Sequence, residues 1–390
     1  MNNLTNFVVF KDFSLARRWA GRRPALSTLC EAYLDGALDI VDLDGFFEAR
    51  TELADYSLTL QHLKQFVTRM IPEWTLHSRA QDRRIVREHY DRGDDFFAAF
   101  LGERMVYTSG IFHDAAESLE QGQDNKLDLV CQKVRLQPDA ELLDVGCGWG
   151  TLALHAARQY GARATGVTLS QNQTAFGNAR IERAGLASRA RIECRDYREI
   201  PEKVYDRIVS LEMVEHVGLK RLSSFFRLIS TRLKDDGLFF LQFAGLRRGG
   251  GLGVPPVGMR PEDMIWGLFM NKYVFPGADA SPPLSTMLKA MEQAGFGIYS
   301  VENISIHYSL TIKRWHENWQ RNAEAVRQSY GERWFRLWNF FLAWSWRIGA
   351  QGNSECFQVV AHKNLDGFDR KIFLPGNAAA RVERVPMHAA

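Results

Sequence analysis

The stretch 142–150, which reads L-L-D-V-G-C-G-W-G, constrains the fold of this chain most strongly. Its leucines and valine supply the apolar side chains of a buried strand, and three closely spaced glycines follow. Glycine lets the backbone turn sharply and approach a ligand closely. Residues 151–160 then have the composition of a helix, which Gly161 is placed to end. The stretch therefore predicts a strand, a glycine-rich turn and a helix in succession.

The acidic residue in this turn indicates the kind of ligand. Asp144 stands just before Gly146 and Gly148, and no G-K-[ST] follows. A nucleotide P-loop places cations near its phosphates, so a carboxylate here favours a neutral or cationic ligand. S-adenosylmethionine, with its ammonium and sulfonium groups, fits. The alternative is a packing turn in some other α/β protein, because glycine patterns of this kind are widely shared.

The composition limits the class of protein. The chain has 390 residues, 46% of them hydrophobic, and a net charge of only +3. That length suggests two or three units at roughly 100–200 residues each, and the small charge argues against a nucleic-acid partner. The five scattered cysteines lack any C-x-x-C, which predicts free thiols and neither a disulfide framework nor a metal site. With no signal-peptide layout and no apolar run of ~20 residues, we expect a cytoplasmic protein, with peripheral contact at the inner membrane surface left open.

Changes in composition suggest four segments. Residues 1–75 form a small N-terminal domain, and residues 76–137 form a helical approach segment that contributes to the active site. Arg79, Arg83, Arg84 and Arg87 in that segment make either a solvated helix face or a site for anionic phospholipid headgroups. Catalytic chemistry is expected in a domain at 138–363 with a lid insertion at about 246–283, followed by a polar, loosely held tail at 364–390.

Strands and helices alternate through the third segment. The predicted strands are 141–145, 163–168, 190–194, 205–210, 238–243, 299–306 and 356–362, and the predicted helices include 151–160, 171–184, 219–233 and 284–294. A further helix is predicted at 124–134, ahead of the first of these strands. This order predicts an α/β fold with a doubly wound, Rossmann-like parallel sheet, a small α-rich N-terminal domain and a helical lid. Ligands of such sheets bind at the carboxyl ends of the strands, where the polar motifs of this chain fall.

The motifs resemble those of the cyclopropane-fatty-acyl-phospholipid synthase family, which includes the mycolic acid cyclopropane synthases and is related to coclaurine-type N-methyltransferases. The resemblance covers about residues 25–363 and implies a class I S-adenosylmethionine methyltransferase. It is carried by E-A-Y-L-D-G-A-L-D-I-V-D-L at 31–43, H-Y-D-R-G-D-D-F-F at 89–97, Y-T-S-G at 107–110, L-D-V-G-C-G-W-G at 143–150, G-V-T-L-S-Q-N-Q at 166–173 and E-H-V-G at 215–218.

The resemblance implies a cofactor site for S-adenosylmethionine at matching residues. Tyr107 and Thr108 would line its methionine end. The first turn would contribute Asp144, Gly146 and Gly148. At the end of the second strand, where a carboxylate is ordinarily expected for the ribose, the chain has Thr168, Leu169 and Gln173. The adenine would lie between Asp196 and Tyr197. For any one of these polar residues, the alternative is a helix or turn cap.

The resemblance also implies a general base. In the family a bicarbonate ion, held by a Cys, a Glu, a His, a Tyr and backbone groups, removes a proton from the alkylated chain. Glu215 and Tyr308 match that pattern, whereas Ser109 replaces the Cys and Gln242 replaces the His. Serine and glutamine still donate hydrogen bonds, but glutamine carries no charge to hold an anion. These replacements leave bicarbonate binding in doubt.

Glu212 and His216 suggest a second source of base chemistry. They stand four residues apart in E-M-V-E-H, which would place them on one face of a helix. The related N-methyltransferases have this E-x-x-E-H pattern, in which the first Glu and the His bind and deprotonate an amine. A carboxylate beside an imidazole is a plausible base near neutral pH. The alternative is that His216 only caps or packs the helix.

These features favour methyl or methylene transfer to an unsaturated acyl chain of a phospholipid. The runner-up is N- or S-methylation of a small amine or thiol by Glu212 and His216, and a third hypothesis is a regulatory protein that binds S-adenosylmethionine without catalysis. Aromatic residues in 266–344 suit either an acyl chain or a passing cation, although ordinary core packing accounts for many of them. The product type, the double-bond position and a homodimer stay open.

Overall fold

The structure, a computed structural model, describes residues 4–65, 68, 93–248, 258–275, 282–374 and 384. Several predicted features lie outside these residues: the basic cluster at Arg79, Arg83, Arg84 and Arg87, residues 249–257 and 276–281 of the predicted lid, and residues 375–383 and 385–390 of the predicted tail.

A seven-stranded sheet forms the centre of the chain, in the order β5-β4-β3-β6-β7-β9-β8. The strands from β5 to β7 are parallel, and β9 runs antiparallel to both of its neighbours. Their bounds are β3 Glu141–Val145, β4 Arg163–Thr168, β5 Ala190–Cys194, β6 Tyr205–Leu211, β7 Leu233–Leu246, β8 Phe296–Asn303 and β9 Ser354–Lys363. This arrangement confirms the predicted doubly wound α/β fold.

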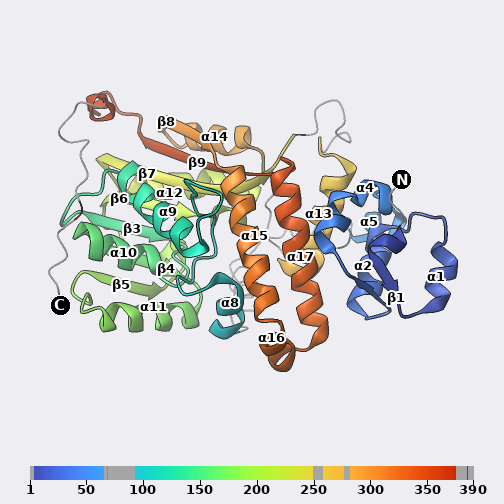
Figure 1. Cartoon of the computed structure of the whole chain (residues 1–390). Helices are drawn as coiled ribbons and strands as arrows, with labels where there is room; N and C mark the ends of the chain where they lie inside the picture. The colour runs from blue at the N-terminus through green and yellow to red at the C-terminus, as the bar shows by residue number, and fades with distance from the viewer. Residues whose placement is uncertain are drawn as a thin grey trace.

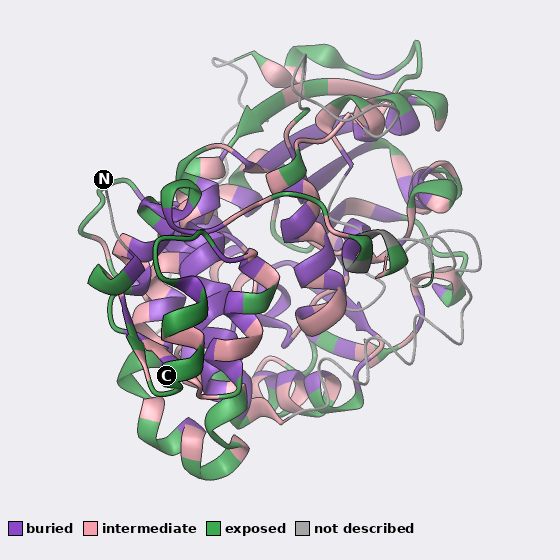
Figure 2. Cartoon of the chain, turned by 90° about the vertical axis from the view of Figure 1, so that its right-hand side faces the viewer, coloured by how far each residue is buried: buried purple, intermediate pink, exposed green. Residues whose placement is uncertain are grey.

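Helices cover both faces of the sheet (Figure 1). One face packs under α9 (Leu119–Lys133), α10 (Thr151–Tyr160) and α11 (Gln171–Arg183), and the other under α12 (Leu222–Arg232) and α14 (Leu284–Gln293). Side chains of a strand alternate between its two faces, so Leu142 belongs to the first core and Leu143 to the second. Buried residues accordingly line the inner sides of the elements, and exposed residues line the outer sides (Figure 2).

Most predicted elements of this domain match the observed ones closely, and two differ for local reasons. The helix predicted from residue 124 begins at Leu119, because Ser118 and Gln121 form a capping box. The strand predicted at 299–306 lies at Phe296–Asn303, because helix α15 (Ser305–Arg321) starts directly after it. The side chain of Asn303 accepts the backbone N–H of Ser305 at 2.9 Å and so ends the strand.

The N-terminal unit does not have a separate core. It contains β1 (Val8–Phe10), β2 (Leu38–Ile40) and helices α1 to α5, at Phe13–Trp19, Leu26–Leu34, Leu43–Glu48, Arg50–Leu53 and Leu60–Gln65. Its buried residues form one cluster with the long helix α17 (Glu332–Ala350), which stands with α15 between this unit and the sheet (Figure 1). The ring of Phe47, for example, stacks on Trp344 with 5.7 Å between centroids.

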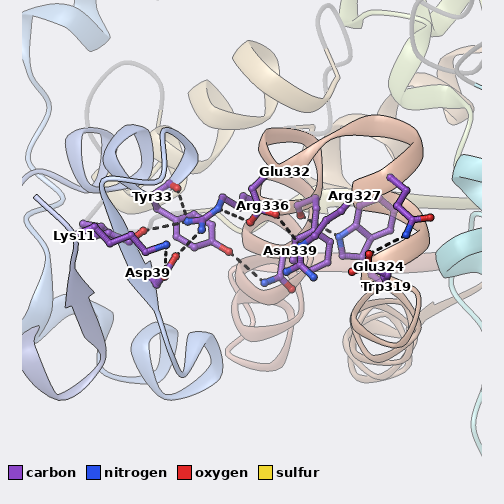
Figure 3. A network of polar contacts seen from close by, with 12 residues as sticks. Lys11, Tyr33, Asp39, Trp319, Glu324, Arg327, Glu332, Arg336 and Asn339 are labelled. Carbon is purple, nitrogen blue, oxygen red and sulfur yellow. Dashed lines mark hydrogen bonds and ion pairs between the residues drawn. The ribbon is translucent and has the colours of Figure 1, made fainter.

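A buried guanidinium joins this unit to α17 (Figure 3). Arg336 is 8% exposed and donates to the backbone oxygens of Tyr33 and Leu38 at 3.0 and 3.1 Å. It also pairs with Asp39 at 2.6 Å and with Glu332 at 2.7 Å. Because each nitrogen of this planar group donates to at least one partner, the group fixes the orientation of the unit on the helix.

The predicted lid and tail are packed where the structure describes them. Within the lid, α13 (Pro261–Phe269) and the π-helix Met270–Val274 join the same aromatic core, with Trp266 4.8 Å from Trp344. Within the tail, Phe368 is 6% exposed and stacks on His362 at 4.0 Å, so the described part of this segment is anchored to the sheet at that residue. No helix in the described ranges is both long and apolar enough to cross a membrane.

Candidate active site

A cavity opens at the carboxyl ends of β3, β4 and β6 and contains about 1220 Å³ of empty space, part of it open to solvent. It is the position at which parallel α/β sheets bind their ligands. The structure brings most of the predicted site residues to its wall: Tyr107, Thr108, Asp144, Gly146, Gly148, Thr168, Leu169, Gln173, Tyr197, Glu212 and His216.

The glycine-rich turn shapes the floor of the cavity. Gly146 has φ +82°, and a Cβ built on it would lie 2.3 Å from Cγ of Met213, so only glycine fits. Gly148 also has a positive φ, +53°, but a Cβ there would meet nothing within 4 Å, because it faces the open cavity. The N–H groups of Gly146 and Cys147 donate to the carbonyl of Val167, which fastens the turn to β4.

Two buried charged groups give the cavity its electrostatic character. Asp144 is 2% exposed, and burial raises the pKa of its carboxyl to about 7. Its Oδ1 has no hydrogen-bond partner within the part of the chain that the structure describes. Lys126, on α9, donates to Oγ1 of Thr108 at 2.9 Å, and burial lowers the pKa of its ammonium group to about 8. An unsatisfied buried carboxylate oxygen favours a ligand that brings hydrogen-bond donors or positive charge.

The ends of β4 and β5 form the opposite side of the cavity. The hydroxyl of Thr168 donates to Oε1 of Gln173 at 2.6 Å, so these two residues make one polar unit where a carboxylate was expected. Asp196 does not line the cavity: both of its oxygens accept from the guanidinium of Arg198, at 2.7 and 2.6 Å. Tyr197 and Arg198 line the wall there, with the guanidinium of Arg198 over the Tyr197 ring, and the predicted contact of Asp196 with an adenine amino group stays a prediction.

Glu212 is the most unusual residue of the site. It follows β6 with φ +51°, a conformation that is uncommon for any residue with a side chain. Strained backbone of this kind persists where the surroundings impose it and often marks functional sites. Its Oε1 accepts the N–H of Ser109 at 2.8 Å and the amide of Gln242 at 2.6 Å, and it lies 3.8 Å from the thiol of Cys356.

The left-handed backbone corrects one prediction. Glu212 and His216 do not share a helix face, because the strand ends at Leu211 and the helical turn that follows it, the 3₁₀ segment Val214–His216, begins only after Glu212. Both side chains nevertheless reach the cavity wall. The ring of His216 lies 6.3 Å from that of Phe275, so its surroundings are partly aromatic.

The other predicted catalytic residues lie behind the wall. Ser109 and Gln242 are fully buried, and Tyr308 belongs to a small apolar cluster with Ile111 and Cys356. The backbone N–H of Ser109 and the side-chain amide of Gln242 donate to Glu212, whereas the Ser109 hydroxyl donates to the carbonyl of Gly110 at 3.0 Å. Neither side chain expected to replace the family's Cys and His therefore points a free donor at a bicarbonate ion. A second anion beside Glu212 would face a like charge in a buried setting, so the residues present do not fit a bicarbonate ion.

Glu215 has a different environment from Glu212. Its Oε1 accepts the N–H of Ala244 at 2.6 Å, and its Oε2 has no partner among the described residues. Burial, and next the neighbouring charge of Glu212, raise the pKa of Glu215 to about 8. Two adjacent buried carboxyls resist being ionised together, and Glu215, with its pKa raised to about 8, stays neutral near pH 7.

Aromatic rings pack around Tyr107, which lines the cavity. The ring of Tyr107 lies 5.7 Å from Phe97, 5.4 Å from Phe100, 5.3 Å from Trp315 and 6.1 Å from Phe275. Most aromatic residues that the sequence singled out are core residues of the shared cluster and do not line the cavity: Trp266, Phe269, Tyr273, Trp334, Trp338, Phe341 and Trp344.

Several polar residues in or behind the cavity wall were not predicted from the sequence, among them Lys126, Arg198, Gln358 and Lys133. Lys126 was detectable, because helical spacing puts it on the buried face of α9 with Leu119, Leu127 and Val130. Gln358 and Lys133, which extend the hydrogen bonds of Gln242, carry no comparable signal, since their role depends on strand register.

Comparisons with known proteins agree with this geometry. Residues 77–359 match the family described as mycolic acid cyclopropane synthetase. A sphingolipid C9-methyltransferase of Komagataella phaffii is 46% identical over 94% of this chain and 76% of its own length, and sphingolipid C9-methyltransferase 2 of Gibberella zeae is 48% identical over 94% and 70%. A probable fatty acid methyltransferase of Pseudomonas putida is 30% identical over 87% and 83%.

Solved structures show the same fold. The mycolic acid cyclopropane synthase CmaA1, in complex with SAH and CTAB, is 27% identical with a TM-score of 0.68, over 72% of this chain and 98% of that one. Coclaurine N-methyltransferase superposes with a TM-score of 0.68 over 87% of this chain and 99% of that one, at 20% identity.

Proposed function

Because the chain belongs to the mycolic acid cyclopropane synthetase family of S-adenosylmethionine-dependent methyltransferases, we propose that it methylates an alkene carbon of an unsaturated sphingolipid chain, with Glu212 as the base. The single observation that carries this proposal is the carboxylate of Glu212, which is held by Ser109 and Gln242 at the wall of the cofactor cavity.

The cofactor is S-adenosylmethionine, and the residues of the cavity fit it. Asp144, with its unsatisfied oxygen, suits the ammonium group, and the Thr168–Gln173 pair suits the ribose hydroxyls. The ring of Tyr197 offers a face for the adenine. When bound, S-adenosylmethionine supplies an electrophilic methyl group next to a positively charged sulfur.

A carbon–carbon double bond is a suitable acceptor for this site. The double bond supplies the electron pair for the new bond to the methyl carbon while the bond from that carbon to sulfur breaks, so the sulfur leaves neutral and positive charge is left on the other alkene carbon. Loss of a proton from the methylated carbon restores the double bond and gives a methyl branch. Glu212 takes up that proton, since its carboxyl lies at the cavity wall and its Oε1 is held by two donors, and the ring of Tyr107 at the same wall favours the passing cation.

The lipid class rests on the relatives. Those at 46–48% identity are named for sphingolipids, whereas the one at 30% is named for fatty acids. We therefore place an unsaturated sphingolipid ahead of the phospholipid acyl chain that the sequence favoured. Contact with a membrane surface and a homodimer stay predictions of the sequence.

Methylation of a small amine is the second candidate, because Glu212 and His216 both line the cavity. A competition assay separates the candidates. The protein is incubated with methyl-labelled S-adenosylmethionine and, in parallel, with vesicles of an unsaturated sphingolipid, vesicles of an unsaturated phosphatidylglycerol, and a small benzylic amine. We expect label in the sphingolipid. Label only in the phospholipid would show that the substrate is a phospholipid and not a sphingolipid. Label only in the amine would overturn the proposal.

A further inference from the structure

A row of polar side chains crosses the sheet beside Glu212. Gln242 of β7 is directly paired with Gln358 of β9, and Gln358 is directly paired with Glu302 of β8. Paired residues on neighbouring strands place their side chains on the same face. That face packs under α9, since Phe240 and Val360, two residues from each glutamine, belong to the core on that side.

The hydrogen bonds in this row all run in one direction. Nζ of Lys133, the last residue of α9, donates to Oε1 of Gln358 at 2.7 Å. Nε2 of Gln358 donates to Oε1 of Gln242 at 2.9 Å, and Nε2 of Gln242 donates to Glu212 at 2.6 Å. Lysine can only donate and an ionised carboxylate can only accept, so the two ends fix the orientation of both amides.

This arrangement is costly unless every bond is made. Gln242 and Gln358 are 0% and 1% exposed, between apolar neighbours on the same strands. A buried amide without hydrogen-bond partners lowers the free energy of unfolding by roughly as much as a large-to-small substitution in the core. Two apolar residues at these positions would pack without needing hydrogen-bond partners. The row reaches the surface at Lys133, whose side chain is 14% exposed and pairs with the exposed Glu302 at 2.5 Å.

We propose that Lys133 and Gln358 are positioning residues for Glu212: their hydrogen bonds aim the Gln242 amide at the carboxylate and favour its ionised form. The inference rests on the proposed role of Glu212 as the base. Lys133 lies at the far end of the row, where the side chains of Gln358 and Gln242 separate it from Glu212.

The hydrogen bonds of this row act against the effect of burial on the pKa of Glu212. Burial raises the pKa of Glu212, while the N–H of Ser109, the amide of Gln242 and the charge of Lys126 act in the opposite direction. The titratable groups that face Glu212 from the elements around it are Lys126 of α9, Glu215 of the 3₁₀ segment, Cys356 of β9 and Tyr308 of α15. Without the row, the Gln242 amide can rotate and leave the carboxylate with weaker donors.

Two substitutions test the proposal in the full chain. Lys133→Met removes the outer charge, and Gln358→Met removes the middle amide at similar volume. Lys363→Met is the matched control, because Lys363, the last residue of β9, has a side chain that is 18% exposed and pairs with Asp235 at 2.9 Å, but it makes no hydrogen bond to the row. Urea unfolding and calorimetric binding of S-adenosylmethionine establish that each variant is folded and loads its cofactor.

The first readout is the pH dependence of methyl transfer. Weaker hydrogen bonding to Glu212 raises the pH at which its carboxyl becomes ionised. We therefore expect the acid limb of the pH–rate profile to shift to higher pH by about one unit in Lys133→Met and Gln358→Met. The limb should stay in place in Lys363→Met. A purely structural role would lower stability in all three variants without moving the limb.

The second readout needs no lipid. The carbonyl stretch of protonated Glu212, identified by infrared difference against Glu212→Gln, is followed through a pH titration. An upward shift of its midpoint in both row variants supports the inference even if the lipid assignment fails. Midpoints equal to that of the unmodified protein, in variants that are folded and bind S-adenosylmethionine, would overturn it.

Discussion

Replacement of Glu215 by Gln should stabilise the protein, and the gain should grow with pH. Burial raises the pKa of this carboxyl from 4.5 to about 8. Since the folded-state pKa lies above the unfolded one, the stability linked to the neutral carboxyl is complete below pH 4.5 and is lost as the pH rises toward 8. The window of the effect is therefore pH 4.5 to 8.

The size of the effect follows from the shift. One pKa unit corresponds to about 1.4 kcal/mol, so the unmodified protein loses roughly 3 kcal/mol of unfolding free energy through Glu215 between its ordinary pKa and neutral pH. Glutamine keeps an acceptor for the N–H of Ala244, which now lies 2.6 Å from Oε1, and it has no proton to lose in this range.

Urea unfolding of the unmodified protein and Glu215→Gln, at several pH values from about 5 to 8, measures the difference directly. Other titrating groups cancel in the difference, because both proteins share them. We expect the advantage of the variant to be small at the acid end and to rise by about 1 kcal/mol or more per pH unit toward neutrality. A difference that stays constant across the range would refute the assignment of a neutral, buried Glu215.

Two further substitutions test the cofactor site and the N-terminal contact. Gly146→Ala puts a Cβ 2.3 Å from Met213, so calorimetry should show S-adenosylmethionine affinity reduced by roughly 100-fold or more, whereas Gly185→Ala, with a similar φ of +68° and open space around it, should retain wild-type affinity. Arg336→Met should lower the free energy of unfolding by about 3 kcal/mol and speed hydrogen exchange in β2, because two backbone oxygens and Asp39 lose a buried partner (Figure 3). Its control Arg333→Met removes an exposed pair on the same helix and should change stability by under about 1 kcal/mol in urea unfolding; equal losses in both variants would contradict the role of burial.

The sequence was sufficient for the parts of the fold that local chemistry dictates. The strands at 141–145, 163–168 and 190–194 and the helix at 151–160 have the predicted bounds, because apolar runs end at glycines and polar caps. Most predicted cofactor residues also line one cavity, since the carboxyl ends of neighbouring parallel strands meet at one edge of the sheet.

The parts that depend on tertiary structure could not be predicted in the same way. The left-handed backbone of Glu212 has no sequence signal, because glutamate rarely adopts it. Gln242 and Gln358 are 116 residues apart in the chain and meet only through the register of β7 and β9. Phe368 was assigned to a polar tail, because a single aromatic residue in a polar segment does not show that it will pack on a ring elsewhere in the fold, here that of His362.

The central claim is that Glu212 removes a proton from a methylated lipid chain at the S-adenosylmethionine site. It is tested most directly by mass spectrometry of an unsaturated sphingolipid after incubation with a donor whose methyl group is fully deuterated, using the unmodified protein and Glu212→Gln in parallel. We predict a product that keeps every transferred deuterium, since the proton comes from the chain, and a rate at least ~100-fold lower in a variant that still binds the donor. An equally fast Glu212→Gln, or a product that has lost one deuterium through ring closure, would contradict the account.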